Sequence, residues 1–366
     1  MSDKSERRGY LTLDGLRAVG AFMVVMRHVP WLFGPVAVPE SFLAVDLFYL
    51  VSGFVIAHAY KARLARGGFF REFVLIRLIR LYPLYAFAMG LGLLAAILSV
   101  IVDPAGWWTW NRIEVAVAAG LFLFPMSPGM PSSGSSLDGP VWTLAPELLA
   151  NFAYAGLVRY LKRWMLWAII AVFGALLILV ETHYQSLDVG FGPTEFWAAL
   201  VRVGFSFFAG VLVHETLDAR FKVTNLGAFA LLILLGLILG WRPGEAVKPW
   251  FELASVMIGF PALVVLAARY EPGPMVGRVF GFTGLMSYAI YLLHQPVGNL
   301  TRIALANLPW LEDIDVPDDI SILPFGVLFC LVLLFIAWRL DKDYDAPLRG
   351  WLRRLLLKKK PVAPLS

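Results

Sequence analysis

Apolar runs long enough to cross a membrane recur along this chain from Gly15 to Leu340, with no long polar block between them. A helix needs about 20 apolar residues to cross roughly 30 Å of hydrocarbon. The composition agrees, because 59% of the 366 residues are hydrophobic and 16% are charged. Soluble chains have about 45–50% apolar and about 25% charged residues. We therefore expect an all-α, polytopic membrane protein without a separate soluble domain.

The apolar runs predict about ten transmembrane helices. They divide the chain into an N-terminal tail (1–12), a transmembrane domain (13–340) and a basic C-terminal tail (341–366). A further apolar run, 113–125, is shorter and ends at Pro125. The predicted spans are 13–32, 42–60, 81–102, 141–160, 164–180, 196–215, 226–241, 251–268, 281–301 and 321–340.

The distribution of lysine and arginine predicts the direction of these spans, because basic residues accumulate in cytoplasmic loops. If 113–125 does not cross, most basic residues outside the spans lie on the side of the two termini. We therefore predict that 113–125 is re-entrant or interfacial and that both termini are cytoplasmic. The net charge of +5 then reflects topology, and we expect no nucleic-acid partner. The other side holds only Arg112, Arg242, Lys248 and Arg302.

The C-terminal segment 349–360 (RGWLRRLLLKKK) is basic and amphipathic. Such a helix lies on an anionic membrane surface, with its cations toward the lipid headgroups. We therefore expect membrane lipids of the inner leaflet as its partner.

Ionisable residues inside the first span indicate function, because burying them in a membrane is costly. Arg17 and His28 are 11 positions apart, close to three helical turns, so they share one face roughly 16 Å apart along the axis. Asp14 lies one turn before Arg17 and can pair with it. The alternative is that Arg17 and His28 reach toward opposite membrane interfaces.

Counting about 1.5 Å per residue places His28, Asp46, Glu147 and His294 in one layer, roughly 20–24 Å above the cytoplasmic surface. Imidazole and carboxylate groups together suit acid–base chemistry. A proton relay would use the same residue types. Because no two of these residues are three or four positions apart, we expect no metal site.

A second cluster lies on the predicted cytoplasmic side. Arg77 and Arg80 are one turn apart, just before Tyr82 and Pro83. Arginine forks suit phosphate groups, although positive-inside topology alone would also place arginines here. The two clusters together suggest a long anionic donor, with its phosphates bound at the inner face and its reactive end in the outer layer. The pantetheine arm of coenzyme A is about long enough to connect them.

Five segments resemble the motifs of the acyltransferase family 3 membrane proteins, which O-acylate bacterial surface sugars and some antibiotics. The first resembles an opening motif in which ten residues separate an Arg or Lys from a His. The last resembles a late Ser-Tyr…His-x-Pro motif. The segments are LDGLRAVGAFMVVMRHV (13–29), VDLFYLVSGFVI (45–56), FVLIRLIRLYPLY (73–85), WTLAPELLANFAY (142–154) and SYAIYLLHQPV (287–297).

The resemblance implies that the first-span histidine is catalytic, that arginine pairs support donor binding and that acetyl-CoA is the usual donor. We expect His28 to act as general base or to carry the acyl group, Glu147 to orient it or balance its charge, and Arg17 to complete the catalytic set. Arg27 is not part of the motif and receives no role. The expected donor-binding residues are Arg17, Arg77, Arg80 and Tyr82, and the expected acceptor-binding residues are Asp46, Ser52, Trp142, Tyr288 and His294.

The expected function is transfer of an acyl group, acetyl in the first place, from acyl-CoA to a hydroxyl of a surface or lipid-linked glycan at the bacterial inner membrane. One alternative within the enzyme class is acylation of a small product, such as a macrolide sugar. A proton-coupled transporter is another alternative, but it would not need the Arg77–Arg80 pair. The sequence leaves a homo-oligomer open.

Overall fold

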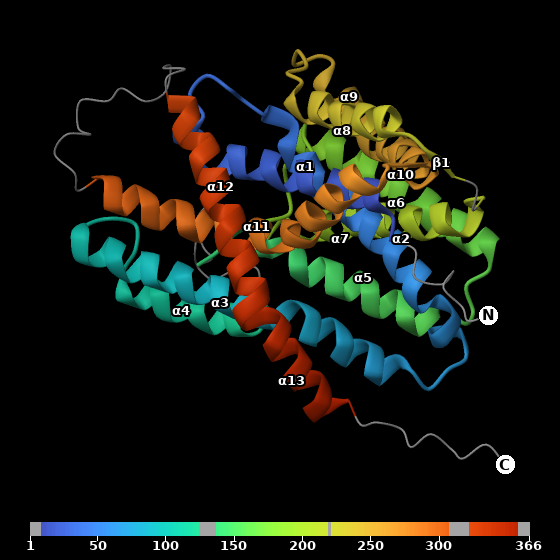
Figure 1. Ribbon diagram of the computed structural model, residues 1–366, viewed down its shortest axis with the longest axis horizontal. Coiled ribbons are helices and arrows are strands. Elements are labelled where there is room, and N and C mark those ends of the chain that lie inside the picture. The colour runs from blue at the N-terminus through green and yellow to red at the C-terminus, as the bar shows by residue number, and fades with distance from the viewer. Residues whose placement is uncertain (1–8, 124–136, 219–220, 307–321, 358–366) are drawn as a thin grey trace.

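The fold is a bundle of helices, described by a computed structural model over residues 9–123, 137–218, 221–306 and 322–357 (Figure 1). The two strands, β1 (Lys222–Val223) and β2 (Tyr270–Glu271), pair in parallel over two residues each. The predicted all-α class is therefore confirmed. The α-helices are α1 (Leu11–His28), α2 (Ala44–Ala65), α3 (Phe70–Val102), α4 (Trp110–Leu121), α5 (Leu144–Leu157), α6 (Arg163–Tyr184), α7 (Phe196–Thr216), α8 (Asn225–Gly240), α9 (Lys248–Ala254), α10 (Phe260–Arg269), α11 (Pro274–Ala306), α12 (Leu323–Leu340) and α13 (Ala346–Leu356).

Short 3₁₀ and π segments join or extend several helices. The 3₁₀ segments η1 (Pro30–Leu32), η2 (Pro39–Leu43) and η3 (Gly139–Thr143) lie between α1 and α5. The π segment η4 (Ser255–Gly259) joins α9 to α10, and η7 (Asp341–Asp345) joins α12 to α13. Each of these two pairs therefore forms one continuous helical rod, as single spans of a membrane would.

Seven helical stretches among the described residues are long and apolar enough to cross a membrane. The prediction of about ten spans is not confirmed. The shortfall has a local cause, since α5 and α8 contain only 14 and 16 residues. Helix α1 has 18 residues, but three of them, Asp14, Arg17 and Arg27, are charged. The seven stretches are Pro39–Ala65, Phe70–Val102, Arg163–Tyr184, Phe196–Thr216, Lys248–Arg269, Pro274–Leu305 and Leu323–Leu356.

Helices continue through charged sequence beyond two of the predicted spans. The stretch 61–80, between two predicted spans, is largely helical, and Arg77 and Arg80 belong to the single 33-residue helix α3. Likewise, the predicted tail 341–366 begins as a helix that continues α12 as far as Leu356. Residues 1–8, Pro125 and residues 358–366 lie outside the described part of the chain.

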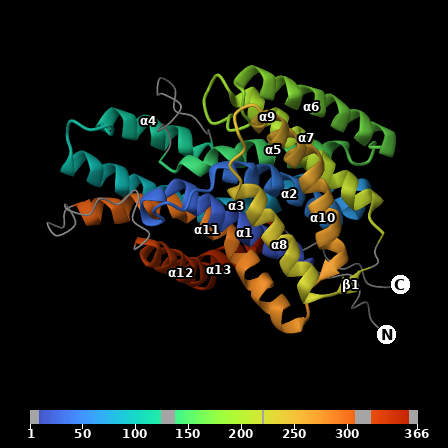
Figure 2. The ribbon, with the colours of Figure 1, turned by 90° about the horizontal axis from the view of Figure 1, so that it is seen from above.

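Helix α1 lies at the centre of the bundle and packs on α11, α8 and α2, as Figures 1 and 2 show from two directions. It runs parallel to α11, because Leu11 meets Gly277, Asp14 meets Gly284 and Val29 meets Gly298. A Cβ atom on Gly284 would lie 2.3 Å from the Asp14 Cβ. Glycine is therefore required for this approach.

Helices α2 and α7 also run parallel, because Asp46 meets Arg202 and His58 meets His214. A Cβ atom on Gly53 would lie 2.0 Å from the Phe207 carbonyl oxygen, and one on Gly210 would lie 1.9 Å from the Leu50 carbonyl oxygen. Small residues at such crossings let helix backbones meet directly, which is a common way of packing helices in membranes. The α2–α7 pair therefore supports the cavity described next.

Candidate active site

A cavity of about 210 Å³ opens between α1, α2, α3, α5 and α11. Three arginines from two helices face it, together with one carboxylate. The surplus of positive charge suits an anionic ligand. The polar residues lining the cavity are Arg17, Tyr49, Ser52, Arg77, Arg80, Thr143, Glu147, Ser287, Tyr288 and Tyr291.

Glu147 is the centre of the polar contacts in this cavity. Its Oε1 accepts a hydrogen bond of 2.7 Å from the Ser52 hydroxyl and one of 3.1 Å from the Arg77 guanidinium. The Nε of Arg77 is buried and has no hydrogen-bond partner. A donor left unpaired in this way is available to a bound anion.

The other two arginines are held more loosely. Arg17 forms an ion pair of 3.6 Å with Asp14, as the sequence predicts. The guanidinium carbon of Arg80 lies 6.0 Å from the centre of the Tyr288 ring. Both guanidinium groups line the cavity, so three planar forks can converge on one ligand.

The histidines occupy a different place. The rings of His28 and His294 lie 5.0 Å apart, and neither residue lines the cavity. The His28 side chain is exposed, and its Nδ1 donates to the Val24 carbonyl over 2.9 Å. Because a carbonyl can only accept, this bond leaves the Nε2 atom of His28 unprotonated in the neutral ring, as a general base requires. His294 is fully buried, and its Nε2 has no hydrogen-bond partner.

Two aromatic side chains of the cavity lining pack against each other, and one of them also lies beside a histidine. Phe48 and Tyr291 both line the cavity, with ring centres 5.7 Å apart in a T-shaped arrangement. The Tyr291 ring also lies 6.0 Å from the His294 ring. The Tyr291 hydroxyl donates to the Pro140 carbonyl over 3.0 Å and lies 3.1 Å from the Thr143 hydroxyl.

The structure does not bring Glu147 to His28, since its carboxylate pairs with Arg77 and Ser52. The depth count assumed that the helix of Glu147 starts at the outer surface. Instead, η3 precedes α5 and is itself largely buried. Asp138, just before η3, is 2% exposed, and burial raises the pKa of its carboxyl well above its usual range. Glu147 therefore lies inside the bundle, beside Arg77 in the cavity.

Three other predicted site residues make structural contacts. Asp46 is fully buried and forms an ion pair of 2.6 Å with Arg202 on α7. The Trp142 ring lies 5.6 Å from the guanidinium carbon of that arginine. The Tyr82 hydroxyl donates to the Leu121 carbonyl of α4 over 2.8 Å. None of the three predicted residues lines the cavity, whereas Ser52 and Tyr288 do.

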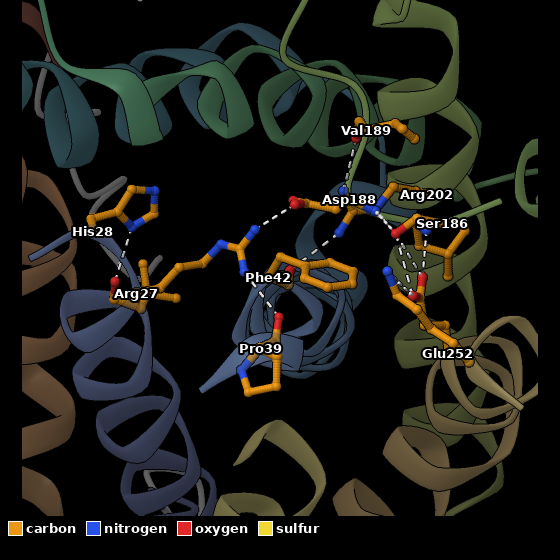
Figure 3. Close-up of polar contacts among 12 residues, drawn as sticks. Arg27, His28, Pro39, Phe42, Ser186, Asp188, Val189, Arg202 and Glu252 are labelled. Atoms are coloured by element: carbon orange, nitrogen blue, oxygen red, sulfur yellow. Dashed lines mark hydrogen bonds and ion pairs between the residues drawn. The ribbon is translucent and has the colours of Figure 1, made fainter. Parts of the chain in front are cut away.

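Sequence reasoning missed Arg202, Asp188 and Tyr291. The signal for Arg202 was available, since it is an ionisable residue within an apolar run, like Arg17. Asp188 gives Arg27 an ion-pair partner in the loop between α6 and α7 (Figure 3). Tyr291 lies within the late histidine segment but carries no charge to single it out.

The helices and the cavity define the class of this molecule as an all-helical membrane protein with an arginine-lined binding cavity. Comparison with known sequences identifies its family: the acyltransferase domain matches residues 10–339. The chain therefore belongs to the acyltransferase 3 family and is an acyltransferase, which confirms the resemblance seen in its motifs. No solved structure matches the chain.

Several curated proteins are similar to this chain. Protein 2 in the picA locus of Rhizobium radiobacter is 34% identical over 195 residues, covering 48% of this chain and 96% of that protein. Exopolysaccharide production protein ExoZ of Rhizobium meliloti is 27% identical over 265 residues, covering 68% of this chain and 74% of that protein. "Putative O-acetyltransferase SACOL0978" of Staphylococcus aureus is 22% identical over 318 residues. The alignment covers 78% of this chain but only 50% of that staphylococcal protein.

Proposed function

We propose that this acyltransferase transfers an acetyl group from acetyl-CoA to a hydroxyl of a surface or lipid-linked glycan. The observation that carries the proposal is the cavity in which Arg17, Arg77 and Arg80 face a single carboxylate. The names of two relatives support it, because one refers to O-acetyl transfer and another to exopolysaccharide production.

The three arginines are the proposed binding site for the phosphates of coenzyme A. Guanidinium forks bind phosphate through paired, charge-assisted hydrogen bonds. From Arg17 the pantetheine arm would follow α1 toward His28, a distance of roughly 16 Å at 1.5 Å per residue. It must pass Phe48 and Tyr291 on this route, so the aromatic pair would move when the thioester reaches the histidine.

His28 is the proposed general base. Its Nε2 removes the proton of the acceptor hydroxyl while that oxygen attacks the thioester carbonyl. The carbon–sulfur bond then breaks, the ester forms, and the proton passes from His28 to the departing thiolate to give free coenzyme A. Transfer through an acyl-imidazole on His28 would form the same products in two steps. His28 is exposed, so an acceptor can reach it in either mechanism.

We place the enzyme in the bacterial cytoplasmic membrane, with both termini and the opening for coenzyme A on the cytoplasmic side. The acceptor then meets His28 from the outer side. This orientation rests on the lysine and arginine distribution and on the positive-inside rule. It also lets a donor made in the cytoplasm modify a glycan outside it.

The donor site is tested by replacing Arg80 with lysine, alone and together with Arg77→Lys. Lysine keeps the charge, and with it the topology signal, but cannot form a bidentate fork. We expect acetyl-CoA binding to weaken by about 1–3 kcal/mol for each lost charge-assisted hydrogen bond. Arg80→Lys is the cleaner variant, because Arg77 also holds Glu147.

Isothermal titration of the purified variants with acetyl-CoA measures the effect. Arg71→Lys is the matched control, since Arg71 lies on the same helix, is exposed and does not line the cavity. Wild-type affinity in the double lysine variant would move the phosphate site away from these arginines.

A further inference from the structure

Arg27 precedes His28 in the last turn of α1, yet the two side chains point in different directions (Figure 3). The His28 ring lies on one side of the helix end, against His294. Arg27 extends to the other side, toward η2 and the loop between α6 and α7. Arg27 therefore does not contact the His28 ring, and its bonds act on the helix end that carries the histidine.

The Arg27 guanidinium makes three different contacts at this place. It forms a close ion pair with Asp188 and donates a hydrogen bond of 2.9 Å to the Pro39 carbonyl. Its guanidinium carbon also lies 5.2 Å from the centre of the Phe42 ring. One side chain thus connects the end of α1 to η2, 12 residues further along the chain, and to the loop of Asp188, 161 residues further along.

The loop that carries Asp188 is itself held firmly. The Glu252 carboxylate accepts a hydrogen bond of 2.5 Å from the Leu187 amide and bonds of 3.3 Å from the Ser186 hydroxyl. Arg202 donates to the Val189 carbonyl over 2.9 Å. Because Glu252 is fully buried and Arg202 is 1% exposed, these bonds are shielded from water and the loop is a rigid support.

This support matters because helix ends fray and the His28 ring depends on the last turn. Its Nδ1 bonds to the Val24 carbonyl, one turn earlier, and this bond sets both the ring direction and the position of Nε2. Without the Arg27 contacts, the turn from Val24 to His28 would lose its attachment to η2 and to the loop of Asp188 and would keep its packing on α11. A misplacement of about 1 Å at a reacting group can lower a rate about a hundredfold.

We propose that Arg27, held by Asp188, is a positioning residue that fixes His28 for acyl transfer. The inference rests on the proposed role of His28 and extends it to a residue outside the family motif. Arg27 touches neither the cavity nor the His28 ring among the described contacts, so it should affect the transfer rate but not donor binding.

The test uses Arg27→Gln, Asp188→Asn and the double variant. Transfer of labelled acetyl groups from acetyl-CoA to membrane glycan and the dissociation constant for coenzyme A are measured on the same preparations. We expect each single variant to lose about tenfold to a hundredfold in transfer rate, with an unchanged dissociation constant. The double variant should be no slower than Arg27→Gln, because both changes break the same contact. Arg27→Lys should be intermediate, since it can pair with Asp188 but lacks the second arm of the fork.

Arg339→Gln is the matched control, because it breaks an exposed ion pair of 2.7 Å with Asp343 far along the chain from either site. It should transfer acetyl groups like the wild type. A wild-type rate in Arg27→Gln, beside an inactive His28→Ala, would overturn the positioning role alone. Equal losses of transfer and of coenzyme A binding would also overturn it, since they indicate a general structural defect. Full activity in His28→Ala would overturn the proposed function and this inference together.

Discussion

Tyr291 occupies the boundary between the two halves of the site. Its ring faces the arginine-lined cavity on one side and His294 on the other. Its hydroxyl is fixed to η3, the segment that leads into the helix of Glu147. A donor arm that passes from the arginines to His28 must displace this side chain, so the hydroxyl contacts oppose that movement.

Replacing Tyr291 with phenylalanine removes the hydroxyl contacts and leaves the ring. One hydrogen bond contributes about 1 kcal/mol net, so we expect acetyl-CoA hydrolysis without acceptor to rise roughly fivefold as the barrier between cavity and histidine loosens. Tyr85→Phe is the control, because the Tyr85 hydroxyl also donates to a carbonyl, that of Gly120, but lies outside the cavity lining. An equal rise in both variants, or none in Tyr291→Phe, would remove this role from Tyr291.

At the residue scale, the sequence predicts the chemistry of the site better than its contacts. The sequence singles out Arg17, Arg77 and Arg80, because charged residues inside or beside apolar runs are costly and usually functional. The structure shows that all three line one cavity. Which carboxylate meets which cation depends on the relative heights of different helices. One sequence does not contain that information, so Glu147 was assigned to His28 and Asp46 to the acceptor.

At the scale of elements, the parallel pairs α2–α7 and α1–α11 restrict the topology. Parallel spans begin on the same side of the membrane, so the chain between α2 and α7 must cross an odd number of times. Helices α3, α5 and α6 supply three crossings if each crosses once, which leaves none for α4. Moreover, α4 has only 12 residues, whereas α5 is extended by η3 into one stretch from Gly139 to Leu157.

We predict that reporter fusions at Ser135 and after Ser366 lie on opposite sides of the membrane. Alkaline phosphatase is active only outside the cytoplasm, and a fluorescent protein folds well only inside it, so the two reporters give opposite readouts at each position. Fusion at Gly67, between α2 and α3 and ahead of 113–125, serves as a cytoplasmic reference. Finding residue 135 on the same side as Gly67 would mean that 113–125 crosses.

The apolar runs predicted most of the helices because burial in lipid requires continuous apolar sequence. They failed at helix ends, since helices extend beyond the membrane or through charges that are paired within the protein. Thus α3 starts before Arg77 and contains it. In the same way, Arg349 bonds back to Asp341 and Asp345 where α12 continues into α13.

At the scale of the whole molecule, α1 connects the two parts of the proposed site. Its first half brings Arg17 to the cavity, and its last residue is His28. The surrounding helices hold it by close packing on α11 and by the Arg27 contacts at its end. The proposed mechanism therefore depends on one step: the donor whose phosphates are bound by the arginines gives up its acyl group at His28.

The most direct measurement of that claim is the acetyl content of surface glycan in cells that carry the wild type or His28→Ala as their only copy. Membrane levels of the two proteins and their affinities for acetyl-CoA are measured in parallel. We predict that His28→Ala binds acetyl-CoA like the wild type but leaves the glycan without the acetyl esters that depend on this enzyme. Wild-type acetylation by His28→Ala at equal membrane levels would contradict it.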